Sequence, residues 1–128
     1  MKTLQIEWLH LDLEGETCDR CQDTGQAIRK AVSQLQQECR PRGWNIVFKE
    51  TKLPAGDIAR SNLILIDGRP LESLLPDAVS SVNHCQSCCD LLGSLSVRCR
   101  TLLFAGKTYD SIPAHLIRKA VCTIAKCC

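Results

Sequence analysis

Two cysteines with two residues between them, Cys18 and Cys21, occur in the segment GETCDRCQDTG, after an apolar run and before a helical pattern. The first turn of a helix has unpaired backbone N–H groups and the positive end of the helix dipole, which stabilise a thiolate. A thiolate attacks disulfides, and a second thiol resolves the mixed disulfide that forms. We therefore predict a catalytic pair, Cys18 as nucleophile and Cys21 as resolving thiol, reachable at the helix end. A metal site and two partly buried thiols that cap the helix are the alternatives.

A second group of cysteines lies in the segment HCQSCC, which contains Cys85, Cys88 and Cys89, and Cys99 follows ten residues later. Thiolates two residues apart can bind one soft ion, because a tight turn directs both sulfurs to the same point. These four cysteines are enough for a tetrahedral site and are the predicted metal ligands, with Zn²⁺ or Cu⁺ as the ion. His84 is a substitute ligand, but a solvated loop histidine is the simpler interpretation.

The two CxxC pairs are far apart in the sequence, with 63 residues between Cys21 and Cys85. Paired CxxC motifs predict a zinc site when about 15–20 residues separate them, so the spacing does not join these two pairs. A fold that brings them together would allow them to share a metal, or to pass a disulfide from one pair to the other.

The remaining cysteines suit structural roles. Cys39 and Cys122 fall on the apolar faces of predicted helices, where cysteine behaves as a small hydrophobic residue. Cys127 and Cys128 are the last two residues given, and we expect them to fray. A vicinal pair at this position could instead add thiols to a shared soft-metal site.

Charged residues near the cysteines could tune the thiols. Arg98 and Arg100 flank Cys99 and could stabilise a thiolate or recognise an oxyanion such as arsenate. Beside the first pair, Arg20 would favour a thiolate and Asp19 would oppose it. Three acidic residues before that pair are best interpreted as a solvated loop: Asp12, Glu14 and Glu16.

The chain has 128 residues with 45% hydrophobic and 23% charged, a globular balance for a single domain over residues 1–128. A net charge of +2 without a basic run, and 4% aromatic residues, predict neither a nucleic-acid nor a membrane partner. Charged residues interrupt the start of the chain and no long apolar run occurs, which argues against an export signal or a membrane span. We therefore expect a cytoplasmic protein, where ten cysteines indicate metal binding or redox chemistry.

The first part of the chain is predicted to form a strand, a helix and a second strand. Apolar residues alternate over 3–8 and also occupy the odd positions of 9–13, as in a strand that becomes covered on both faces near its end. Thr17 is the expected N-cap of a helix that runs to residue 39, because apolar residues recur with helical spacing. Residues 44–50 alternate again, and a helical connection of this length suits parallel strands.

The second part is predicted to contain a buried strand at 63–66, a less regular cysteine-rich segment at 73–100, and a hairpin that turns at Gly106-Lys107. Pro113 is expected near the first position of a last helix. Its predicted apolar face consists of Leu116, Ile117, Ala120, Val121 and Ile124. The predicted fold is α/β, with a central mixed sheet flanked by helices and residues 73–100 inserted before the final hairpin and helix.

Five segments together resemble a small prokaryotic family of uncharacterised proteins, a domain of unknown function grouped with the thioredoxin-like fold. They are GETCDRCQDTG, SNLILIDGRPLE, CQSCCDLLG, CRT and YDSIPAHLIRKA, and the likeness covers nearly the whole chain. The resemblance implies a thioredoxin-like architecture and supplies no activity. The chain departs from thioredoxins in having no tryptophan directly before Cys18, and in having Ser61-Asn62 where thioredoxins place a cis-proline facing the disulfide.

Two functions follow from these residues. The first is a thioredoxin-like dithiol/disulfide redox protein, a thiol-disulfide oxidoreductase that acts on a protein or small-molecule disulfide. The alternative is a soft-metal thiolate-binding protein for Zn²⁺, Cu⁺, Hg²⁺ or trivalent arsenic, without catalytic turnover. A structural zinc domain that mediates protein contacts is a weaker third interpretation.

Overall fold

The computed structural model describes residues 1–128 as a mixed α/β protein with two sheets. The strands are β1 (Lys2–Leu11), β2 (Trp44–Leu53), β3 (Leu63–Ile66), β4 (Arg69–Pro70), β5 (Ala78–His84), β6 (Arg98–Phe104) and β7 (Lys107–Tyr109). The α-helices are α1 (Asp19–Cys39), α2 (Gln86–Leu92) and α3 (Ala114–Ala125). Short 3₁₀ turns follow α1 and connect strands: η1 (Arg40–Arg42), η2 (Ala55–Arg60) and η3 (Leu71–Leu74).

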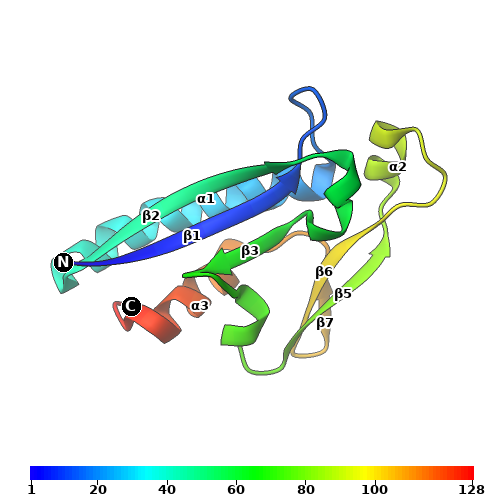
Figure 1. The fold of residues 1–128 in the computed structure, drawn as a ribbon. Helices are drawn as coiled ribbons and strands as arrows, with labels where there is room; N and C mark the ends of the chain where they lie inside the picture. Colours follow the sequence, from blue (N-terminus) through cyan, green and yellow to red (C-terminus); the bar gives the residue numbers. More distant parts are fainter.

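The first sheet has the strand order β2-β1-β3-β4 and mixes both strand directions. β1 and β2 are parallel over their whole length, from Lys2 opposite Trp44 to Leu11 opposite Leu53, whereas β3 is antiparallel to β1. α1 forms the connection between β1 and β2 and lies behind them in Figure 1. The predicted strand, helix and parallel strand are therefore confirmed.

The burial of β1 follows its apolar pattern. Leu4, Ile6 and Trp8 are buried while the residues between them are partly exposed, and 9–11 are buried on both faces. Alternation appears where one face of a strand meets the core, and it disappears where both faces are covered. The change occurs at the end of β1 that leads toward α1, so that this end lies deepest in the molecule.

The second sheet is antiparallel with the order β5-β6-β7, and it corrects the prediction of a single central sheet. The hairpin between β6 and β7 turns at Ala105-Gly106, one residue earlier than predicted, and both residues have positive φ (51° and 82°). A two-residue hairpin loop of this kind matches the twist of its strands. Because the strands form two separate sheets, the structure shows a mixed α/β fold, and the thioredoxin-like arrangement stays a prediction.

Residues 73–100 form regular structure in place of an irregular insertion, since they contain β5, α2 and the start of β6. The strand signal is weak in β5 because both of its faces are largely exposed, so neither face needs to be apolar. α2 has only two turns, too few for a helical period to show. Within this segment α2 carries Cys88 and Cys89, Cys85 directly precedes α2, and Cys99 lies on β6.

The helices pack on one another and on the first sheet. Arg118 of α3 forms an ion pair with Glu38 of α1 at 2.6 Å. Gly25 allows α1 to approach β1, because a Cβ there would lie only 2.6 Å from the Trp8 ring. α2 lies at the end of the molecule where α1 begins, and the chain after α3 lies near the opposite end of α1 (Figure 1). None of the helices combines the length and the apolar character required to cross a membrane.

Candidate metal centre

Cys18 occupies the N-cap position of α1, so the helix begins at Asp19, one residue later than a Thr17 cap would place it. Its backbone is extended, with φ −77° and ψ 164°. The N–H of Asp19, one of the unpaired donors of a first helical turn, donates to Ser87 Oγ of α2 at 3.1 Å. The predicted position of Cys18 at the amino end of a helix is thus confirmed, and α2 is bound to that end.

Three further cysteines, Cys85, Cys88 and Cys99, come from the segment that runs from the end of β5 through α2 into β6. Cys85 is the N-cap of α2, and its N–H donates to the Val97 carbonyl at 2.9 Å. This bond extends the antiparallel ladder in which Asn83 pairs with Cys99. Cys88 follows Cys85 by three residues and therefore lies on the same side of α2. The ladder and the helical turn together bring the three sulfurs to one place.

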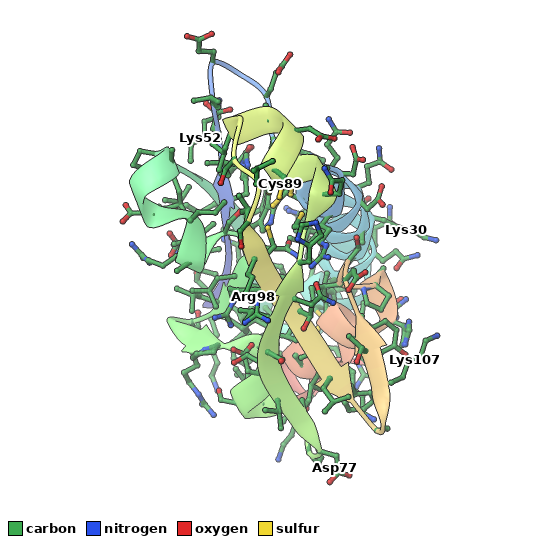
Figure 2. All side chains as sticks on the ribbon, turned by 90° about the vertical axis from the view of Figure 1, so that its right-hand side faces the viewer. Lys30, Lys52, Asp77, Cys89, Arg98 and Lys107 are labelled. Carbon is green, nitrogen blue, oxygen red and sulfur yellow. A yellow bond between two sulfur atoms is a disulfide. The ribbon has the colours of Figure 1, made fainter.

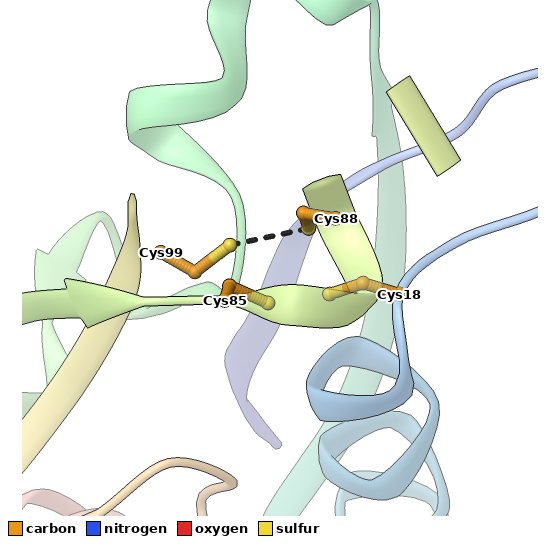
Figure 3. Close-up of side chains that lie close together, drawn as sticks. All are labelled: Cys18, Cys85, Cys88 and Cys99. Atoms are coloured by element: carbon orange, nitrogen blue, oxygen red, sulfur yellow. Dashed lines mark hydrogen bonds between the residues drawn. The ribbon is translucent and has the colours of Figure 1, made fainter. Parts of the chain in front are cut away.

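The sulfur atoms of Cys18, Cys85, Cys88 and Cys99 all lie within 4.8 Å of one another (Figure 3). The Cys99 thiol donates a hydrogen bond to the Cys88 sulfur at 3.2 Å. The four residues are 2%, 1%, 0% and 2% exposed, in sequence order. We call this set the four-cysteine cluster; it joins the amino end of α1 to the connection between β5 and β6.

The thiol protons are shared unevenly in the four-cysteine cluster. The pKa of Cys18 is lowered far below the usual thiol range, first by hydrogen bonding with the Cys21 thiol and then with the thiols of Cys88 and Cys99. The pKa values of Cys88 and Cys99 are raised, first by hydrogen bonding with the Cys18 sulfur and also because both are removed from water. Of the four cysteines, Cys18 is therefore the one that loses its proton most readily in the metal-free cluster.

Cys21 lies beside the four-cysteine cluster and outside it. Its sulfur is 3.2 Å from the Ser61 hydroxyl, whose oxygen accepts the N–H of Leu11 at 2.9 Å. The pKa of Cys21 is raised, because its thiol donates to Cys18 and because it is buried. Cys21 is 1% exposed and Cys18 2%. This burial corrects the prediction of a dithiol reachable from solvent.

Cys89 does not belong to the four-cysteine cluster, although the sequence predicts it among the metal ligands. Its sulfur accepts the Val97 N–H at 3.3 Å. Adjacent residues of a helix point about 100° apart, so Cys88 and Cys89 cannot face the same point. Cys18 is the fourth member in its place. Figure 2 shows Cys89 on α2 beside the sulfur atoms that gather beneath this helix.

The arginines that flank Cys99 do not face it. Side chains alternate along a strand, so Arg98 and Arg100 lie on the opposite face of β6 from Cys99. Arg100 forms an ion pair with Glu72 at 2.6 Å. Neither arginine therefore supports the predicted role of stabilising a thiolate at Cys99.

The other charged and polar residues singled out in the sequence also lie outside the four-cysteine cluster. Arg20 donates to the His84 carbonyl and lies 3.9 Å from the Asp110 carboxylate. His84 is the last residue of β5 and not a loop residue, but its ring is exposed, as predicted, and contacts Gln86 at 3.0 Å. Three acidic residues lie partly or fully exposed in the loop before α1: Asp12, Glu14 and Glu16.

The last cysteines form disulfides. Cys39 is bonded to Cys127 and Cys122 to Cys128, with Cα atoms 5.0 Å and 5.6 Å apart. Cys39 is fully buried, as predicted, but neither it nor Cys122 is the unpaired hydrophobic residue that the helical pattern indicates. The expected fraying of residues 127 and 128 is also wrong, because both are covalently attached to helices. The partners of the first bond have a sequence separation of 88, so no local signal could have predicted it.

The four-cysteine cluster fits a tetrahedral metal. A Zn–S bond of about 2.3 Å places the sulfurs of a tetrahedron about 3.8 Å apart. The sulfurs of Cys88 and Cys99 are 3.2 Å apart, and no separation within the cluster exceeds 4.8 Å. The donors are all thiols, which favour soft ions, and four sulfurs at tetrahedral corners favour Zn²⁺ or iron–sulfur chemistry. The cluster could therefore hold a metal such as Zn²⁺.

Comparisons with known proteins give a family but no activity. A family model described as a domain of unknown function, DUF2703, matches residues 4–121. A protein of Archaeoglobus fulgidus, described as an uncharacterized protein, is 36% identical over 118 residues, which cover 89% of this chain and 82% of that protein. No solved structure matches the chain. The four-cysteine cluster lies entirely within the matched residues.

Proposed function

The chain belongs to the DUF2703 family, and because that membership carries no activity, we propose a function from the site itself. The protein is a soft-metal thiolate protein that binds one Zn²⁺ through the four-cysteine cluster, without catalytic turnover. The observation that carries this proposal is the set of four buried sulfurs within 4.8 Å of one another. Zn²⁺ is the ion whose coordination preference uses all four donors.

The closed geometry supports binding rather than catalysis. Catalytic zinc sites keep a coordination position for water or substrate, whereas structural sites have four protein ligands. All four ligand positions here are supplied by cysteine, and each cysteine is at most 2% exposed. When bound, the metal supplies positive charge that compensates the thiolates. The residues themselves exclude water and hold the sulfurs in place.

The position of the four-cysteine cluster gives the metal a structural consequence. Cys18 belongs to the connection that follows β1 in the first sheet, and Cys99 lies on β6 of the second sheet. A metal held by both therefore links the two sheets. α2 lies between these attachments and makes few other contacts, such as the bond from the Asp19 N–H to Ser87. Metal binding should accordingly contribute to the stability of this end of the molecule.

The test is a metal titration of protein purified anaerobically without chelator, with both disulfides intact. We expect one Zn²⁺ per chain, and Co²⁺ substituted for it should show the absorption of tetrahedral sulfur coordination. Serine at position 18, 85, 88 or 99 should lower Zn²⁺ affinity by more than about 100-fold, since loss of even an outer hydrogen-bond partner of a ligand costs about 10- to 100-fold. Parallel titrations with Cu⁺ and trivalent arsenic identify the preferred ion.

Cys89→Ser is the matched control for these substitutions. Cys89 is buried next to Cys88 but lies outside the four-cysteine cluster, so its replacement removes a buried thiol without removing a ligand. Its Zn²⁺ stoichiometry should be that of the wild type. Fully reduced protein that binds no Zn²⁺ and no other soft ion would refute the proposal, as would equal losses in Cys89→Ser and Cys88→Ser.

Dithiol exchange at Cys18 and Cys21 is a second candidate function, supported by the lowered pKa of Cys18, of which the neighbouring Cys21 thiol is the first cause. The Cys18 thiolate would attack a disulfide of a protein or small molecule and release one substrate thiol. Cys21 would then attack the mixed disulfide, leaving a Cys18–Cys21 disulfide and the second substrate thiol. The substrate gains two electrons, and the dithiol loses them.

Exchange at Cys18 requires that a substrate reach a sulfur now covered by α2, and a metal bound to Cys18 would block it. Metal-free protein should therefore reduce a small aromatic disulfide faster than metal-loaded protein. Cys21→Ser should accumulate the mixed disulfide at Cys18. Equal rates for the wild type and Cys18→Ser would rule out this second function.

A further inference from the structure

Four cysteines outside the four-cysteine cluster gather where α1 and α3 end. Cys39 is the last residue of α1, Cys122 lies in the last turn of α3, and Cys127 and Cys128 follow that helix. Lys126 has a left-handed backbone, φ 53°, which turns the chain at the end of α3. The sulfurs of Cys39, Cys127 and Cys128 all lie within 4.8 Å of one another, and Cys122 is bonded to Cys128. We call these four residues the α1–α3 cluster.

The α1–α3 cluster is separate from the four-cysteine cluster. Cys18 directly precedes α1 and Cys39 is its last residue, so the 21 residues of this helix hold them about 30 Å apart. Figure 1 shows the chain ending near the carboxyl end of α1, while α2 lies near its amino end. A ligand bound by the α1–α3 cluster would therefore be a second ligand of the chain.

Packing of the two helices holds these sulfurs together in addition to the disulfides. The guanidinium of Arg118 on α3 contacts Glu38 and Gln34 of α1, at 2.6 Å and 3.1 Å. Cys39 is 0% exposed and Cys127 is 2% exposed, so both are covered by the surrounding core. Since these contacts do not depend on sulfur chemistry, the four side chains should stay close together after the disulfides are reduced.

We propose that the α1–α3 cluster is a second soft-metal site, closed when its cysteines are oxidised and open when they are reduced. It offers four sulfurs, the donor set that tetrahedral thiolate sites use. The Cys128 sulfur already lies within 4.8 Å of both sulfurs of the Cys39–Cys127 disulfide, so reduction of that bond places three donors near the separation of about 3.8 Å in a zinc tetrathiolate. A disulfide sulfur has no charge to offer a metal, so the two disulfides and the metal exclude each other.

The switch is a balanced redox reaction. Each disulfide, Cys39–Cys127 and Cys122–Cys128, takes two electrons and two protons from a dithiol or phosphine reductant and becomes two thiols. Zn²⁺ or Cd²⁺ then displaces the thiol protons without further electron transfer. In the reverse direction, an oxidant such as a small-molecule disulfide removes two electrons per pair, forms the two bonds and releases the metal. Cys128 is exposed, which gives the reagent a point of attack.

The two clusters should differ in affinity. Cys18 lies at the amino end of α1, where the helix dipole favours a thiolate, whereas Cys39 lies at the carboxyl end, where it disfavours one. Reduced protein should therefore fill the four-cysteine cluster first and the α1–α3 cluster second. This order also separates the two sites in a titration.

The experiment compares disulfide-containing protein with phosphine-reduced protein under anaerobic conditions. Alkylation after unfolding should count six free thiols in the first sample and all ten cysteines in the second. Cd²⁺ titration, followed by thiolate charge-transfer absorption and native mass spectrometry, should give one ion in the first sample and two in the second. Adding an oxidant to the reduced, loaded protein should release one ion as the disulfides re-form.

Three variants assign the second ion. Reduced protein carrying Cys127→Ser and Cys128→Ser should bind one ion, whereas reduced Cys89→Ser should still bind two. Reduced Cys18→Ser should keep the ion of the α1–α3 cluster, so failure of the proposed function leaves this site testable. Equal binding by oxidised and reduced wild type would overturn the proposal, and this comparison needs no variant to fold. Two ions in the double variant would overturn it as well.

Discussion

Cys18 and Cys21 lie on one turn at the start of α1 and have different neighbours. The Cys18 sulfur lies with those of Cys85, Cys88 and Cys99, whereas the Cys21 sulfur is 3.2 Å from the Ser61 hydroxyl. A sulfur bound to a metal cannot also form a disulfide. Cys18 can therefore either bind a metal with the other three cysteines or form a disulfide with Cys21, but not both at once. Metal load should therefore decide whether the CxxC pair is available for redox chemistry.

Ser61→Ala should destabilise the fold without removing the metal. Ser61 is fully buried, and its oxygen accepts the Leu11 N–H at 2.9 Å while it contacts Cys21. Loss of that acceptor leaves a buried donor unpaired, which lowers the free energy of unfolding by about 1–3 kcal/mol. Urea unfolding measures this difference, and Zn²⁺ stoichiometry should stay at that of the wild type.

Ser73→Ala is the control for this substitution, because the Ser73 hydroxyl donates to the Pro70 carbonyl on the surface. It should change stability little. A loss of Zn²⁺ affinity in Ser61→Ala as large as that in Cys18→Ser would contradict the assignment of Cys21 to a position outside the four-cysteine cluster.

Metal-free protein should lose stability as the pH rises from about 8 to about 10. The raised pKa values of Cys21, Cys88 and Cys99 mean that the folded state keeps protons which the unfolded chain releases at its ordinary thiol pKa. Their contribution is complete below that pKa and is lost above it. The lowered pKa of Cys18 acts in the opposite sense, because its contribution is present above the unfolded pKa and is lost toward acid. In the alkaline range the stability lost through the three raised pKa values exceeds the stability contributed by the lowered pKa of Cys18.

Urea unfolding of metal-free protein at several pH values tests this dependence, and metal-loaded protein is the internal control. In the loaded protein the ligand thiols are already deprotonated, so the alkaline loss should be smaller and the metal should instead be lost toward acid. Equal stability of the metal-free protein at both ends of the alkaline range would be evidence against neutral thiols in the folded cluster.

Removal of the metal should loosen α2 more than the first sheet. α2 has only seven residues, and a metal would attach it to Cys18 and Cys99. Hydrogen exchange of residues 85–97 and of the first turn of α1 should become several-fold faster after chelation. Exchange in the paired region of β1 and β2 should not change. Uniform acceleration across both regions would instead indicate that the metal supports the whole fold.

Gly25→Ala should lower the free energy of unfolding, although alanine favours helices. A Cβ at this position would lie 2.6 Å and 3.0 Å from two atoms of the Trp8 ring, so α1 or the indole must shift. Overpacking of this kind costs about 1–3 kcal/mol, against a gain of about 1 kcal/mol in helix propensity. Gly56→Ala is the control, since its Cβ would meet nothing within 4 Å. A stabilised Gly25→Ala would show that α1 is not packed tightly on Trp8.

Local patterns were sufficient to predict a large part of the fold. β1, α1 and β2 were predictable because each has one face against the core, so apolar residues recur with the period of the element. The burial of Leu116, Ile117, Ala120 and Val121 in α3 follows from the same periodicity. β5 carries no such signal because most of its residues are exposed on both faces. The division of the strands into two sheets depends on long-range pairing, which no local pattern records.

The sequence by itself determined that cysteines would dominate the chemistry, that Cys18 would lie at a helix start, and that Cys85, Cys88 and Cys99 would lie near one another. Tertiary structure alone decided that Cys18 joins them in place of Cys89, and that Cys39 meets Cys127. Spacing in the sequence controls which side chains share a turn or a strand face, because bond geometry fixes those short distances. Spacing in the sequence sets no distance between segments that are many residues apart. The sulfurs of such segments are brought together by packing, of α2 on α1 in one cluster and of α3 on α1 in the other.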